Sequence, residues 1–150
     1  MRRKGRFRRR DRGSLSLFVV LFTPVVLMLA GLVVDGGIAL NARERAADVA
    51  QQAARAGAND LDVVSLRSGQ VTLAPTACAT ALSFVSKYDG VHAVPDGCST
   101  SVADGLPAVN VTVTVTVPTQ LLDAIGIGTF TEKATGSASP VCGITAGGQC

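Results

Sequence analysis

The segment LSLFVVLFTPVVLMLAGLVV, residues 15–34, decides the fold of this chain because its twenty residues carry no charge. At about 1.5 Å of rise per residue, such a helix matches a bilayer hydrocarbon core of roughly 30 Å. Its interruptions are mild, since Thr23 can bond back to its own helix and membrane helices tolerate Pro24 and Gly31. A chain of 150 residues is too short to bury this segment in a larger core. The segment therefore predicts a membrane-spanning helix.

Basic residues are concentrated in front of this segment. Eight of the fourteen Lys and Arg residues lie within residues 2–12, whereas the chain from residue 13 onward carries six basic and ten acidic residues, a net charge of −4. A basic cluster beside a membrane helix stays in the cytoplasm and attracts anionic lipid. A nucleic-acid-binding arm is the competing interpretation, but Phe7 is the only aromatic residue among the arginines. We expect a cytoplasmic arm over residues 1–13, an extracytoplasmic C-terminal part and no nucleic-acid partner.

Helix-forming residues continue beyond the apolar segment. The stretch IALNARERAADVAQQAARAGAND, residues 38–60, is rich in Ala, Arg, Glu and Gln, and its first stop signal lies at residues 57–60. The pattern predicts one helix over residues 14–58, which would loosen first at Gly36 and Gly37. Alanine recurs at every fourth position of its outer half, at Ala42, Ala46, Ala50, Ala54 and Ala58. Small side chains let another element approach closely, and that element is either the chain's own C-terminal part or a partner helix.

The clearest strand signal is AVNVTVTVTVP, residues 108–118, in which valine alternates with Asn or Thr. Strict alternation of β-branched residues is typical of a half-buried strand. Residues 97–103 can pair antiparallel with it across the turn at Asp104 and Gly105, and residues 129–139 can return as a further strand. The remaining segments are expected to form a short hairpin or two extended pieces over residues 64–75, a short helix over residues 76–88 and a helical turn over residues 119–128.

Together these elements predict an α+β fold. A long N-terminal transmembrane helix would continue outside the membrane and pack on a small antiparallel sheet with one short helix. Residues 59–150 would form the extracytoplasmic unit, which ends in a Gly-rich tail. Four cysteines fall in this part, at Cys78, Cys98, Cys142 and Cys150. Outside the cytoplasm an even number favours disulfides, and of the three pairings the most local joins Cys78 to Cys98 and Cys142 to Cys150.

Residues suited to catalysis are scarce. The chain has one histidine, His92, and no C-x-x-C pair, so neither a histidine metal pair nor a zinc ribbon is expected. The glycines of IGIG, residues 125–128, do not follow the dinucleotide-binding arrangement. We predict no enzyme activity, cofactor, metal or small-molecule substrate. Asp35 closes the apolar segment, and it is either an interfacial acid or a polar contact to a partner in the membrane.

The N-terminal block resembles the corresponding segment of TadE/TadG-like proteins of the tight-adherence (Flp-type) pilus machinery. The matching pieces are the basic lead ending at Gly13, the apolar span with Pro24, the AGLVVDGG exit over residues 30–37 and the Ala-rich helix ending in AARAGA. The resemblance covers residues 11–58 and implies a pilin-like, membrane-anchored subunit or accessory factor in pilus assembly or secretion. The partners that the resemblance implies are other pilus subunits or further copies of this chain.

One position departs from the family pattern. Pilin-type sequences carry a Glu five residues after the Gly at which a peptidase cuts, and here that position is Phe18. Cleavage between Gly13 and Ser14 is therefore not expected, and the resemblance favours a TadG-like retained anchor. The alternative function is an extracytoplasmic binding protein unrelated to pili, either anchored or released by cleavage after Ala39.

Overall fold

The computed structural model describes residues 12–140 of the chain. Its dominant element is α1 (Arg12–Ala58), a single α-helix that continues through Pro24, Gly36 and Gly37. Pro24 lacks a backbone N–H, and the Thr23 hydroxyl nearby donates a hydrogen bond of 2.7 Å to the carbonyl oxygen of Val19. The helix predicted over residues 14–58 is confirmed.

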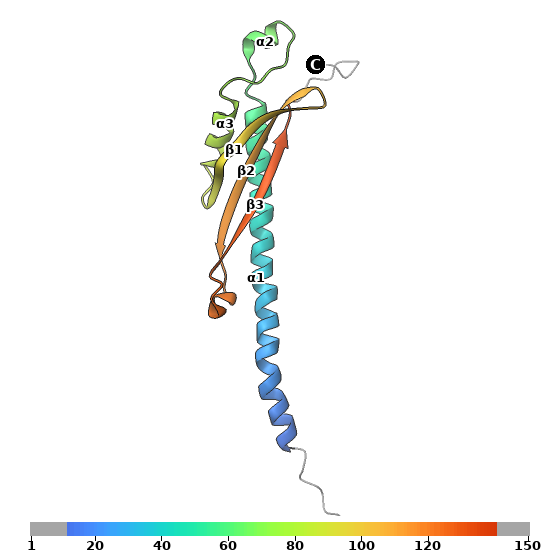
Figure 1. Cartoon of the computed structure of the whole chain (residues 1–150), viewed down its shortest axis with the longest axis vertical. Coiled ribbons are helices and arrows are strands. Elements are labelled where there is room, and N and C mark those ends of the chain that lie inside the picture. The colour runs from blue at the N-terminus through green and yellow to red at the C-terminus, as the bar shows by residue number, and fades with distance from the viewer. Residues whose placement is uncertain (1–11, 141–150) are drawn as a thin grey trace, which may run out of the picture.

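Three antiparallel strands lie along the outer half of α1 (Figure 1), while its apolar N-terminal half extends away from them. The strands are β1 (Val91–Ala103), β2 (Leu106–Pro118) and β3 (Thr129–Ala138), and β2 is the central one. The α+β fold with a long apolar N-terminal helix is therefore confirmed. The loop between β2 and β3 lies at the end of the sheet nearest the apolar half of α1.

The core forms where the alternating valines of β2 meet the alanines of α1. Val109, Val111 and Val113 are fully buried. On the opposite face of β2, Thr112 and Thr116 each form a hydrogen bond with a threonine of β3. The alanine side chains at positions 42, 46, 50, 54 and 58 are all buried in the same core. At Gly136 the backbone of β3 comes so close to α1 that a Cβ atom would overlap the backbone of Ala50. Short side chains thus bring sheet and helix together.

Two short helices complete the part of the structure that follows α1, residues 59–140, which we call the outer unit. Helix α3 (Ala77–Val85) confirms the helix predicted there and packs against α1 and β1. The extended structure predicted over residues 64–75 is wrong at its start, because α2 (Val63–Arg67) is helical. The Asp62 side chain accepts hydrogen bonds from the backbone N–H groups of Val64 and Ser65, which caps this helix.

Strand β1 begins earlier than the pairing predicted over residues 97–103. It starts at Val91, and its register with β2 shifts between Ala93 and Cys98. Residues 95–97 have the sequence Pro-Asp-Gly, which is typical of a turn, but here they form a bulge within one strand. Asp96 has a positive φ of 54°, and a Cβ atom at Gly97 would lie 2.7 Å from the carbonyl oxygen of Thr112.

Candidate functional site

The first feature of the site is the exposed apolar half of α1. Nearly all side chains over residues 15–34 are exposed, including Met28 at 67% and Val33 at 75%. Among residues 12–140, α1 is the one helix long and apolar enough to cross a membrane. An apolar surface of this extent is far larger than the patches that soluble monomers expose.

The second feature is the contact that Gly31 makes with the β2–β3 loop, residues 119–128. Gly31 is buried, although its neighbours along the helix are exposed. A Cβ atom at this position would lie 3.0 Å from the Cβ of Leu121. The missing side chain therefore makes the space in which Leu121 packs against α1.

Asp35, one helical turn further along, holds the same loop. Its carboxylate accepts hydrogen bonds from the backbone N–H groups of Gln120 at 2.8 Å, Leu121 at 3.0 Å and Leu122 at 2.7 Å. Asp35 is completely buried. Charge-assisted bonds from three donors compensate the carboxylate for its loss of water. Asp35 thus caps η1, the 3₁₀ turn Leu122–Ile125, from a position 85 residues away from Gln120 in the chain.

Neither interpretation of Asp35 drawn from the sequence anticipated this contact. The side chain is buried, and the groups that it binds in the structure are backbone N–H groups of its own chain. Gly31 and Asp35 stand four residues apart on one face of α1. Together they attach the loop to the end of the apolar segment.

Residues 13–60 match the family model of putative Flp pilus-assembly TadE/G-like proteins. The match confirms the resemblance noted in the sequence and includes both Gly31 and Asp35. It covers α1 and stops before the sheet. No curated protein and no solved structure matches the chain. The match supports a role connected with pilus assembly.

Within the TadE/G-like segment, the alanine stripe packs on the chain's own outer unit. The five alanines are at most 3% exposed and contact the sheet and α3. A Cβ atom at Gly57, near the end of the stripe, would lie 2.8 Å from the carbonyl oxygen of Ala77. In this arrangement the stripe has no surface left for a partner helix. The sequence left open whether the stripe recognises other subunits, and the burial of these residues does not support such a role.

The remaining residues singled out in the TadE/G-like segment lie in its first turns. Gly13 and Ser14 belong to the start of α1. Phe18 is 61% exposed, and its ring stacks on that of Phe22 with centroids 5.3 Å apart. A Glu at position 18 would place a carboxylate within the apolar surface of α1, whereas Phe18 extends that surface. That the bond between Gly13 and Ser14 stays intact remains a prediction from the sequence.

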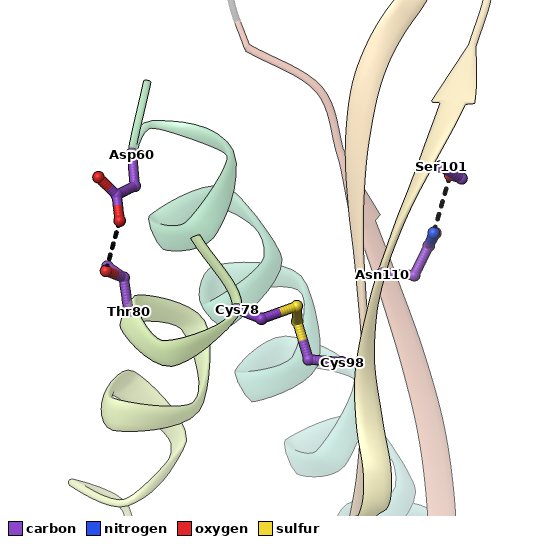
Figure 2. Close-up of a disulfide and its surroundings, with 6 residues drawn as sticks. All are labelled: Asp60, Cys78, Thr80, Cys98, Ser101 and Asn110. Atoms are coloured by element: carbon purple, nitrogen blue, oxygen red, sulfur yellow. Dashed lines mark hydrogen bonds between the residues drawn. A yellow bond between two sulfur atoms is a disulfide. The ribbon is translucent and has the colours of Figure 1, made fainter. Parts of the chain in front are cut away.

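The outer unit beyond the TadE/G-like segment contains the Cys78–Cys98 disulfide, which links α3 to β1 (Figure 2). This pair agrees with the most local pairing, whereas Cys142 and Cys150 lie outside the described residues. Close by, Asp60 follows the end of α1 and accepts hydrogen bonds from the hydroxyls of Thr76 at 2.8 Å and Thr80 at 2.7 Å. The disulfide and the Asp60 contacts fix α3 from two sides.

The double variant Cys78→Ala/Cys98→Ala is expected to lower the free energy of unfolding by about 3 kcal/mol, because the bridge closes a loop with a sequence separation of 20. Urea unfolding of the full chain in detergent micelles, followed by circular dichroism, measures the change. Ser99→Ala, at an exposed position of the same strand, is the control and should leave the midpoint unchanged. An unchanged midpoint in the double variant would contradict a stabilising bridge.

Asp60 also makes the outer unit sensitive to acid. The hydrogen bonds from Thr80 and Thr76 lower the pKa of Asp60 below its ordinary value of 3.8. Because the pKa is lower in the folded state, this contribution to stability is complete above about pH 4 and is lost as the pH falls through the folded value. In Asp60→Asn the stability above pH 4 should be lower and the decline on acidification shallower. Urea midpoints measured from pH 7 to pH 3 test this, with Asp89→Asn as the charge-matched control.

The described residues show no arrangement suited to catalysis. His92 is exposed on β1, and no group of three His, Cys, Asp or Glu side chains within residues 12–140 is placed to hold a metal ion. A surface pocket of about 590 Å³ lies between the start of α3 and the β1–β2 hairpin. Its lining consists of apolar, hydroxyl and disulfide-bonded side chains. The chemistry available at these places is that of packing and contact.

Proposed function

We propose that this chain is a single-pass, membrane-anchored and non-enzymatic component of a Tad/Flp-type pilus assembly or secretion apparatus. Residues 15–34 span the membrane, the basic arm stays in the cytoplasm, and the outer unit faces the extracytoplasmic side. Its role is pilin-like: it positions a small α+β unit at the membrane surface for contacts with other subunits of the apparatus or with copies of itself.

The observation that supports this proposal most strongly is the division of α1 into two halves. One face of the outer half is buried by the chain's own sheet, whereas the inner half is apolar and exposed on all sides except at Gly31. A helix that is apolar around its circumference requires a nonpolar environment. The TadE/G-like match extends through both halves. A continuous helix couples the position of the outer unit to that of the membrane anchor.

Subunit contacts would use the surface that the outer unit leaves exposed. The solvent side of α1 presents Arg43, Glu44 and Asp48, and the outer face of the sheet presents a row of threonines. These are polar surfaces, which suit contacts between folded subunits that assemble and separate. The proposal therefore places subunit recognition outside the alanine stripe.

The alternative, a released binding protein, has less support from the geometry. Cleavage after Ala39 would remove Gly31 and Asp35 from the mature chain. The backbone N–H groups of residues 120–122 would then lose the carboxylate that they donate to. An anchored chain keeps these contacts.

Fractionation and protease digestion of cells that produce the chain test the proposal. The protein should remain in membranes washed with alkaline carbonate, and protease added to intact spheroplasts should digest the outer unit while the basic arm stays protected. Opening the membrane should expose the arm as a control. Release by the carbonate wash, or a protected outer unit in intact spheroplasts, would contradict the anchor or its orientation.

A further inference from the structure

We propose that the β2–β3 loop, residues 119–128, is a second membrane contact that inserts apolar side chains into the outer interface of the bilayer. This inference rests on the proposed anchoring by residues 15–34. Its ligand is the boundary between lipid head groups and acyl chains. Leu121 and Ile127 carry the contact, because they are 50% and 44% exposed on a loop fixed to the membrane end of α1.

The depth of the loop follows from the helix to which it is attached. Leu121 packs over Gly31, which lies three residues inside the end of the apolar segment at Val34. At about 1.5 Å of rise per residue, Gly31 lies roughly 4.5 Å on the membrane side of that end. The side chains beside it, Leu32 and Val33, are exposed and apolar. A span at residues 15–34 therefore places Leu121 at the level of the outer lipid boundary.

The hydrogen bonding of the loop suits that environment. Irregular backbone is tolerated near hydrocarbon only where its polar groups are satisfied within the protein. Asp35 accepts from the N–H groups of residues 120–122, and the N–H groups of Thr119, Ala124, Gly126 and Ile127 donate to carbonyl oxygens of the same loop. The buried hydroxyl of Thr119 donates to the carbonyl oxygen of Ile127. The loop thus presents apolar side chains with its backbone donors largely paired.

The charge of the loop indicates how it contacts lipid. Residues 119–128 contain no Lys or Arg, and Asp123 is their one charged residue. Attraction to anionic head groups is therefore not the driving force, unlike that of the basic arm on the cytoplasmic side. The driving force for the contact is the burial of the apolar side chains of Leu121 and Ile127 in the lipid. With α1 and this loop as two attachment points, the sheet has a defined orientation on the membrane surface.

The sequence provides a direct probe, because the chain contains no tryptophan. Single-tryptophan variants of the full chain are reconstituted in phosphatidylcholine vesicles whose acyl chains carry bromine, which quenches nearby tryptophan. Ile127→Trp and Leu121→Trp report on the loop. Val33→Trp reports on the anchor, and Val102→Trp, 77% exposed in the hairpin end of the sheet, is the solvent control.

Both loop variants should show blue-shifted emission and a loss of intensity approaching that of Val33→Trp, with bromine near the head groups more effective than bromine near the bilayer centre. Val102→Trp should be unaffected. Leu121 packs tightly on Gly31, so Ile127→Trp decides the result if Leu121→Trp disturbs the loop. Quenching should persist at high salt, since the contact is apolar.

The failures of the two proposals are distinguishable. Quenching of Val33→Trp without quenching of Ile127→Trp would overturn the loop contact and leave the anchor intact. Blue-shifted but unquenched emission from Ile127→Trp would mean that protein, such as a second copy of the chain, covers the loop, and would also overturn the inference. Absence of quenching in Val33→Trp would overturn the anchor and the loop contact with it.

Discussion

The variant Gly136→Val is expected to lower the free energy of unfolding of the outer unit by about 3 kcal/mol or more. Gly136 is the point on β3 where the strand touches the backbone of α1. Even a Cβ atom there would overlap the backbone of Ala50 and Gln51. The atoms that a Cβ would overlap belong to the helix backbone, which cannot rotate away as a flexible side chain can. The strand must therefore move away from α1. The Gln51 side chain, which donates to the Ser137 carbonyl oxygen at 2.9 Å, would be displaced as well.

Urea unfolding of the full chain in detergent micelles measures this effect, with Ser137→Val as the matched control. Ser137→Val places a valine in the same strand, but on its exposed face. Its effect should remain within about 0.5 kcal/mol. If Gly136→Val were as stable as Ser137→Val, the close packing of β3 on α1 would be incorrect.

The variant Asp35→Asn is expected to release the β2–β3 loop without unfolding the sheet. In the original chain both carboxylate oxygens accept hydrogen bonds from backbone N–H groups. In the variant one oxygen is replaced by an NH₂ group, which cannot accept them. It also loses the negative charge that strengthens all three bonds. The backbone N–H groups of residues 120–122 should therefore exchange with solvent roughly tenfold faster or more.

Hydrogen exchange followed by mass spectrometry of peptides measures this release. Asp123→Asn removes a charge from an exposed side chain of the same loop and is the control, for which exchange should not change. Peptides from β2 should stay protected in both variants. Equal protection of residues 120–122 in Asp35→Asn and in the original chain would show that the Asp35 cap does not hold the loop.

The parts of the fold that follow local periodicity could be predicted from the sequence. The apolar run over residues 15–34 predicts a helix and the alternation in β2 predicts a strand. Both patterns can be recognised within a few neighbouring residues, because helix and strand periods are properties of the local backbone. The Cys78–Cys98 pair was favoured for the same reason of short separation. The sequence analysis did not predict α2, although Asp62 precedes it and Asp is a preferred N-cap residue.

The candidate site was harder to predict because its contacts are long-range and involve backbone groups. Asp35 binds N–H groups 85 to 87 residues away, and a backbone donor has no residue type by which it can be recognised. The one available signal was the pair Gly31 and Asp35 at helical spacing, a small residue and an acid on the same face. Gly136 gave a weaker signal, since an isolated glycine in a strand pattern often marks a close backbone approach.

The most direct test of the anchored account is the N-terminal mass of the protein isolated from carbonate-washed membranes. The account predicts a chain that retains the arginine-rich arm, with the bond between Gly13 and Ser14 intact. A membrane-bound chain that begins at Ser14 would show pilin-type processing despite Phe18 and contradict the retained arm. A chain that begins at Leu40 and is recovered from the medium would contradict the anchor itself.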